Sequence, residues 1–179
     1  PEKKNRLETL VLFTSEIQLK KLEKADQIFM DSTFKICPKN FYQLFNIIIS
    51  IEGGKFIFPV IHILMTHKSE FSYRIIFNNI ETIIKSKKIN FNFSKKHIMT
   101  DFEHALRKVI RELYPTCYLE GCYFHYSKAL WKKAKKLGLI NGNKNIKKVL
   151  DTINQMIIEE YDKYALLSNR KNKVLRIAK

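Results

Sequence analysis

The chain has 179 residues, of which 45% are hydrophobic and 28% charged. This composition is typical of a soluble globular protein with one core and excludes a disordered chain. The apolar run from Phe56 to Met65 contains Pro59 and His62 and is too short to span a bilayer. There are 33 Lys and Arg against 17 Asp and Glu, which gives a net charge of +16. Such an excess favours polyanion partners, although a basic but inert surface would give the same count.

The cysteines and the first residues indicate where the protein works. Cys37, Cys117 and Cys122 form an odd and sparse set, which argues against a secreted disulfide framework. The chain opens Pro1-Glu2-Lys3-Lys4, without a Met or an apolar segment. We therefore expect no signal peptide, a reducing intracellular environment, and a chain that is a piece of a longer protein.

The first predicted elements are a strand and a helix. Leu10 to Phe13 is a short apolar run and a candidate strand. Ser15 follows it and is predicted to be the N-cap of a helix that carries Ile17, Leu19 and Leu22. Both elements fall in a lead-in of residues 1–25.

Three β-rich segments come next, and the signals between them predict hairpins. They are, in order, Ile28–Ile36, Tyr42–Ile51 and Lys55–Thr66. Gly53-Gly54 is a strong hairpin signal between the second and third segments. Pro59 marks a bulge or an edge position in the third, because proline cannot donate to a ladder of strand hydrogen bonds.

Helical periodicity then alternates with short strands. Ser69 is the predicted N-cap of a helix with an apolar stripe from Phe71 to Ile84. The remaining predicted elements are a polar loop at 85–96, a strand at 97–101, a helix at 102–113, a strand at 117–123, a helix at 126–137 and a helical stripe at 146–161. This order predicts an α/β fold, an RNase H-like mixed five-stranded sheet flanked by helices.

Two acids are candidates for chemistry. Asp31 lies inside an apolar strand, where a carboxylate is costly unless it is paired, hydrogen-bonded or bound to a metal. Asp101 ends a strand and opens a helix, and ligands gather at such carboxyl ends in open α/β sheets. If the two strands are neighbours, the carboxylates converge and can bind Mg²⁺ for phosphoryl transfer. The plainer alternatives are a solvent-facing acid at 31 and a helix N-cap at 101.

Cys122 and His125 form a Cys-x-x-His pair at the end of the last predicted strand. With Cys117 nearby they could suggest zinc, but a structural zinc site needs four ligands and no second Cys/His pair follows. The alternative is a small buried cysteine beside a hydrogen-bonded histidine.

Four segments, in this order, resemble the transposase domains of Mutator-like elements (MULE). They are Met30–Pro38, Met65–Glu70, Met99–Leu106 and Gly121–Tyr126. The likeness covers roughly residues 26 to 137 of the chain. It implies a core at 26–137, followed by a partial helical insertion and basic tail at 138–179.

The resemblance implies a DDE transposase with an RNase H-like fold that cuts and joins DNA with a divalent metal, Mg²⁺ or Mn²⁺. Asp31 would be the first catalytic and metal-binding acid, and Asp101 the second. Cys122 and His125 match a motif thought to sit beside the active site and support DNA cleavage. Transposon ends and target DNA would be the partners, in the nucleus and away from membranes. Assembly into a homo-oligomer is left open.

Two departures from the family pattern bear on activity. The family usually has Asp-Gly-Thr at the first acid, where this chain has Asp31-Ser32-Thr33. No Asn-Asn-x-x-Glu-like motif follows His125. Glu159 and Glu160 are the alternatives for the third acid, but they resemble exposed helix acids, so we expect the third acid beyond Lys179.

Three functions therefore compete. The leading one is part of a MULE-type catalytic domain that is incomplete or inactive by itself. The second is a domesticated DNA-binding or interaction module without catalysis. The third is an RNase H-like nuclease that uses Glu159 or Glu160.

Overall fold

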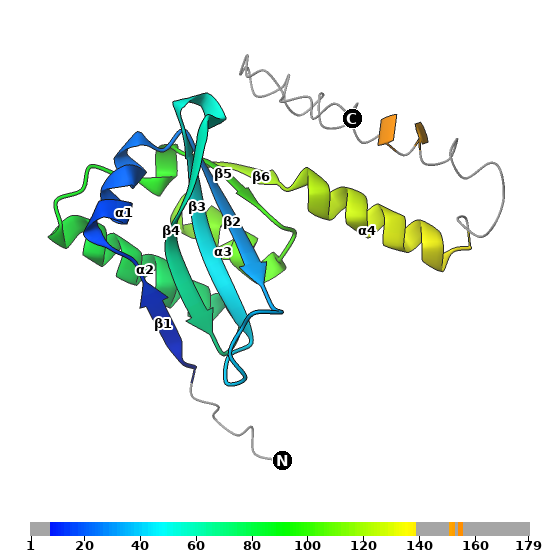
Figure 1. Cartoon of the computed structure of the whole chain (residues 1–179), viewed down its shortest axis with the longest axis horizontal. Coiled ribbons are helices and arrows are strands. Elements are labelled where there is room, and N and C mark those ends of the chain that lie inside the picture. Colours follow the sequence, from blue (N-terminus) through cyan, green and yellow to red (C-terminus); the bar gives the residue numbers. More distant parts are fainter. Residues whose placement is uncertain (1–7, 139–150, 153, 156–179) are drawn as a thin grey trace. The chain divides into compact units, whose positions relative to one another are not determined.

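The computed structural model describes residues 8–138, 151, 152, 154 and 155 (Figure 1). The chain divides into two compact units, residues 1–122 and 123–179. Each unit is described by itself below. The division into 1–25, 26–137 and 138–179 stays a prediction.

A mixed sheet forms the frame of the first unit. Its strands are β1 (Leu10–Phe13), β2 (Gln27–Thr33), β3 (Gln43–Ile51), β4 (Phe56–Met65), β5 (His97–Thr100) and β6 (Tyr118–Gly121). Their order across the sheet is β1-β4-β3-β2-β5-β6. Neighbours from β1 to β2 are antiparallel, whereas β2, β5 and β6 run parallel. The predicted α/β class is confirmed, and a sixth strand joins the sheet because β1 pairs with the outer edge of β4.

Helices cover one face of this sheet. The first unit contains α1 (Glu16–Lys21), α2 (Glu70–Ser86) and α3 (His104–Leu113), with 3₁₀ turns at Leu22–Lys24, Glu52–Gly54 and Phe93–Lys95. Both predicted N-caps are confirmed: the side chains of Ser15 and Ser69 accept hydrogen bonds from the backbone N–H of Gln18 and Ser72. Among the described residues, no helix is long and apolar enough to cross a membrane.

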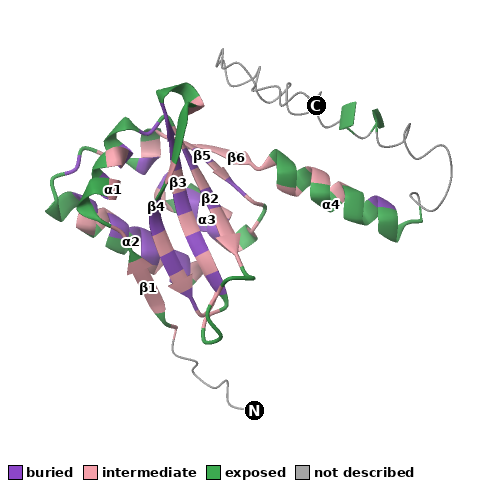
Figure 2. Cartoon of the chain, in the orientation of Figure 1, coloured by how far each residue is buried: buried purple, intermediate pink, exposed green. Residues whose placement is uncertain are grey.

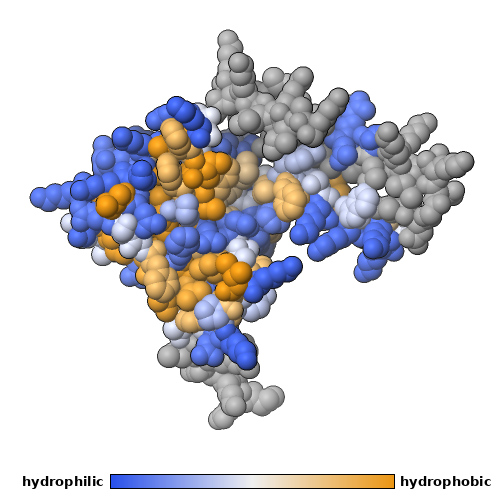
Figure 3. Space-filling model, viewed as in Figure 1, coloured by the Kyte–Doolittle hydropathy of each residue, from blue (hydrophilic) through white to orange (hydrophobic). Residues whose placement is uncertain are grey.

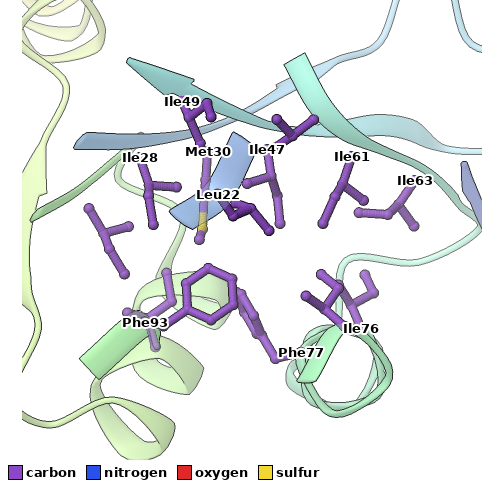
Figure 4. Close-up of a cluster of buried hydrophobic side chains, with 14 of the residues drawn as sticks. Leu22, Ile28, Met30, Ile47, Ile49, Ile61, Ile63, Ile76, Phe77 and Phe93 are labelled. Carbon is purple, nitrogen blue, oxygen red and sulfur yellow. The ribbon is translucent and has the colours of Figure 1, made fainter. Parts of the chain in front are cut away.

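The core lies between the sheet and these helices. Burial alternates along β3 and β4, so that every second side chain faces inward (Figure 2). Isoleucines of the strands point toward Ile76, Phe77 and Phe93 (Figure 4). Leu22 after α1 is also buried in this cluster. The alternation leaves the remaining side chains of β2 and β5 on the opposite face, and this decides where the acids lie.

Three local predictions are refined by the structure. The second strand ends at Thr33 instead of Ile36, and Phe34 and Ile36 are exposed. Pro59 lies next to a register shift in the pairing of β3 with β4, as expected for a bulge. The segment predicted as a polar loop at 85–96 buries Ile89 and Phe93, so it closes one side of the core.

The second unit begins with α4 (Tyr123–Lys136). This helix starts three residues before the predicted one and ends at the predicted place, with Gly138 at a φ of 72°. A positive φ just after a helix is a conformation that glycine adopts without a steric penalty. Of the predicted stripe at 146–161, residues 151, 152, 154 and 155 are helical, and the rest lies outside the described residues.

Candidate active site

The two predicted acids lie side by side on neighbouring parallel strands. Met30 of β2 is the register partner of Thr100 of β5. Each is followed directly by an acid, Asp31 or Asp101. Met30 and Thr100 are buried on the core side, so strand alternation turns Asp31 to the opposite face, and Asp101 follows the last residue of β5. Because neighbouring strands lie about 4.8 Å apart, the two carboxylates start from adjacent backbone positions.

The row of register partners continues to the third parallel strand. Thr100 of β5 pairs with Gly121 of β6, which places Cys122 next to Asp101. The backbone N–H of Cys122 donates to the carbonyl oxygen of Thr100 at 2.7 Å, so the ladder extends one step beyond β6. The strand register therefore gives three of the four predicted site residues, Asp31, Asp101 and Cys122, adjacent backbone positions. The fourth, His125, lies in the first turn of α4 in the second unit, and its predicted approach to the acids stays a prediction.

Asp101 shapes the turn that leads into α3. Its Oδ1 accepts a hydrogen bond of 3.1 Å from the backbone N–H of Glu103. Glu103, and not Asp101, occupies the N-cap position of α3, although its side chain makes no capping hydrogen bond. Asp101 thus stands two residues before the N-cap of the helix, with one carboxylate oxygen fixed by the turn.

Arg107 of α3 ties the ends of β5 and β6 together. Its guanidinium Nη1 donates to Thr100 Oγ1 and to the carbonyl oxygen of Glu120, each at 2.9 Å. Thr100 Oγ1 in turn donates to the carbonyl oxygen of Asp101 at 2.7 Å. Burial and then the nearby Arg111 lower the pKa of Arg107, while the negative charge of Asp101 opposes that shift. This network holds the backbone at the candidate acid.

A close contact also sets the loop after Asp101. A Cβ atom added to Gly121 would lie 2.7 Å from Cε1 of Phe102, closer than real Cβ contacts allow. The Phe102 ring also has the Arg107 guanidinium 5.5 Å from its centroid. Gly121 is therefore the residue that lets the Phe102 ring pack against β6.

Sequence reasoning missed two polar side chains that extend the row on the other side of Asp31. Asn46 of β3 is the register partner of Asp31, and His62 of β4 is the register partner of Asn46. The Asn46 Oδ1 and His62 Nδ1 atoms are 2.7 Å apart. The sequence did contain a signal for this pair, because an asparagine and a histidine are unusual inside two otherwise apolar strands.

Glu103 occupies a more buried environment than its exposed neighbours on the helix. Its side chain is only 11% exposed, and Lys68 Nζ lies 3.8 Å from its Oε2. Burial raises the pKa of Glu103, and the negative charge of Asp101 raises it further. The hydrogen bond from the Tyr73 hydroxyl and the positive charge of Lys68 lower this pKa. The contacts with Lys68 and Tyr73 link Glu103 to α2 and the loop before it.

The remaining candidates give a partial ligand set. Burial raises the pKa of the Cys117 thiol, which makes it a poorer thiolate donor. In the part of the chain that the structure describes, no three His, Cys, Asp or Glu side chains are grouped as a metal site would need. Glu159 and Glu160 lie outside that part. Asp31 and Asp101 fit a hard divalent cation by their oxygen donors, as two ligands of a larger set.

Fold and site together define an α/β domain with two acids at adjacent positions where the parallel ladder of β2 and β5 ends. A comparison with protein families matches residues 27–129 to the MULE transposase domain. The match covers more than half of the 179 residues, so the chain belongs to the MULE transposase domain family, and its function is related to transposition. Comparisons with curated proteins and with solved structures gave no match.

Proposed function

We propose that this domain supplies the first two acids of a DDE-type active site, which cleaves and joins DNA with Mg²⁺ or Mn²⁺ in the complete protein. Its partners are transposon ends and target DNA, and it acts in the nucleus. The observation that carries the proposal is the register of Met30 with Thr100, because it makes Asp31 and Asp101 neighbours.

The chemistry needs each of these features. Divalent metal ions held by Asp31 and Asp101 together with a further ligand would activate a water or a 3′-hydroxyl and would stabilise the leaving oxygen. In this proposal the carboxylates of Asp31 and Asp101 bind the divalent cation and fix its position. Cys122, the neighbour of Asp101 in the row, packs beside the acids, and His125 holds or polarises a DNA phosphate. The net charge of +16 favours the approach of DNA.

Two carboxylates hold one ion loosely, and a further ligand is needed to fix the second ion. The described residues place no third acid in the row of Asp31 and Asp101. We therefore propose that the 179-residue chain by itself neither cleaves nor transposes DNA.

Metal binding tests the shared site. Titration of the chain with Mn²⁺, followed by calorimetry, should show weak binding that Asp31→Asn and Asp101→Asn each remove. Glu81→Gln is the matched control, because Glu81 is a surface acid of α2 paired with Lys85, and it should bind like the unchanged chain. Binding that survives both aspartate substitutions would refute the shared site and favour a module without catalysis.

Cleavage is a separate test. The chain is incubated with Mg²⁺ or Mn²⁺ and with single-stranded, nicked and duplex DNA, and we expect no product. Metal-dependent cleavage that Asp31→Ala and Asp101→Ala abolish would instead identify a nuclease. Its further loss in Glu159→Gln or Glu160→Gln would identify the third acid.

A further inference from the structure

Aromatic and basic side chains alternate along one side of α4. Phe124, Lys128, Trp131 and Lys135 follow one another at positions i, i+4, i+7 and i+11, which places them on a single helix face. All four are exposed, Phe124 by 63% and Trp131 by 44%. Lys128 Nζ lies 5.5 Å from the centroid of the Phe124 ring. These four residues are called the α4 stripe below.

The α4 stripe lies beside the buried side of its helix, not on it. Ala134 is buried, and Ser127 and Leu130 beside it are half-buried. An ordinary amphipathic helix buries its aromatic side chains and exposes its charges. In α4 the rings of Phe124 and Trp131 stay outside with the lysines, and those of Tyr123 and Tyr126 are also exposed. Figure 3 shows that the α4 surface in view is mostly hydrophilic, unlike the orange areas over the sheet.

The charge of α4 selects the partner. The helix contains five lysines and no acidic residue, so it complements a polyanion. Proteins that bind single-stranded nucleic acid combine cations along the backbone with aromatic rings on which bases stack. Phe124 and Trp131 are seven residues apart, about 10 Å along a helix, with Lys128 between them and Lys135 beyond. The α4 stripe has both components in alternation.

A membrane surface would also attract a basic helix with aromatic residues. Helices that lie on membranes separate an apolar face from a basic face, so that the apolar side enters the bilayer. Lysines interrupt the aromatic residues within the α4 stripe itself, whereas the apolar side chains of Tyr126, Leu130 and Leu137 lie on another side of the helix. The pattern therefore favours a nucleic acid over a lipid.

We propose that the α4 stripe binds single-stranded DNA, with bases stacked on Phe124 and Trp131 and phosphates neutralised by Lys128 and Lys135. This inference rests on the proposed function for the choice of DNA as the polyanion. It assigns the domain a surface for unpaired strands, formed by residues other than the metal-binding acids.

Trp131 provides a direct probe, because it is the single tryptophan of the chain. The complete chain is titrated with oligo-dT while tryptophan fluorescence and, separately, anisotropy of labelled oligo-dT are followed. Stacking on Trp131 should quench its fluorescence. Phe124→Ala and Trp131→Ala, followed by anisotropy, should each weaken binding roughly five- to 150-fold, the range for loss of one stacked base.

Charge and stacking separate in a salt titration. Lys128→Gln with Lys135→Gln should reduce the slope of log affinity against log salt by about 1.4, which is 0.7 for each lost phosphate contact with a single strand. The aromatic substitutions should lower affinity and leave this slope unchanged. Lys133→Gln with Lys136→Gln is the matched control, since both lysines are exposed on other sides of the same helix, and it should preserve the quenching of Trp131.

Each outcome decides the proposal. It is overturned if the two lysine pairs behave alike, if oligo-dT leaves Trp131 fluorescence unchanged, or if duplex DNA or anionic vesicles quench Trp131 more strongly than oligo-dT. Circular dichroism shows whether each variant is folded, and Trp131→Phe, which keeps a ring, should retain most of the affinity. Mn²⁺ binding at Asp31 and Asp101 has an independent readout, so failure of the stripe and failure of the metal site are distinguishable.

Discussion

The candidate active site and the α4 stripe are built in different ways. The site contains Asp31 and Asp101, at the end of the ladder between β2 and β5. Several contacts fix the backbone of the candidate active site: the paired strands, the hydrogen bonds of Arg107, and the Phe102 ring against Gly121. The α4 stripe depends on the periodicity of a single helix with exposed side chains. Chemistry at a metal requires positions that several contacts define, whereas binding a flexible strand requires only the correct spacing of rings and charges.

The largest expected effect is that of Arg107→Ala. It removes the two hydrogen bonds by which Arg107 bridges β5 and β6, and hydrogen bonds from charged groups are each worth about 1.5–3 kcal/mol. We expect a loss of about 3 kcal/mol in the free energy of unfolding, measured with urea. Arg111→Ala, one turn further along the exposed side of α3, should change stability by less than about 0.5 kcal/mol. Equal losses of stability in Arg107→Ala and Arg111→Ala would show that the candidate active site does not depend on the hydrogen bonds of Arg107.

A smaller effect is expected for Gly121→Ala. The new methyl group would displace the Phe102 ring, and overpacking costs about 1–3 kcal/mol. The ring is 53% exposed and can move outward, so we expect about 1 kcal/mol. In a Phe102→Ala background the same substitution should cost almost nothing, because the clash is gone. Additive losses in this double-mutant cycle would contradict a contact between the two residues.

Two substitutions of Asp101, one of them with almost no expected effect on stability, separate its structural and chemical roles. Asp101→Ala loses the acceptor for the Glu103 N–H and should destabilise the chain by about 1 kcal/mol. Asp101→Asn keeps an acceptor oxygen and should be close to the unchanged chain in stability while it loses Mn²⁺ affinity. If both substitutions cost the same stability, the turn does not depend on that hydrogen bond.

Much of the fold was predictable because its signals are local. Ser15 and Ser69 were predicted as caps from their position before periodic apolar residues, and Gly53-Gly54 as a hairpin. The pairing of β1 was not predictable in the same way, because Leu10 meets Met65 far along the chain. A four-residue apolar run contains no information about which strand it will join.

The site shows the same limit. The acids were predicted because a carboxylate in or after an apolar strand is unusual, and their adjacency followed from the expected strand order. Arg107 was missed because an arginine on the polar side of a helix resembles any surface arginine. Gly121 carried a detectable signal, since a glycine at the end of a strand often marks a close approach, but the Phe102 ring was not predictable.

The short strand β1 also matters for how the protein behaves in solution. It covers residues 62–65 of β4, while Thr14 Oγ1 and Gln18 Nε2 donate to the carbonyl oxygens of Val60 and Pro59. Proline has no N–H to offer, so Pro59 itself discourages pairing with a further strand. A fragment that starts at Gln27, where the family match begins, would expose the long apolar edge of β4. Such edges recruit strands from other copies, so we expect this fragment to aggregate more readily than the chain that keeps β1.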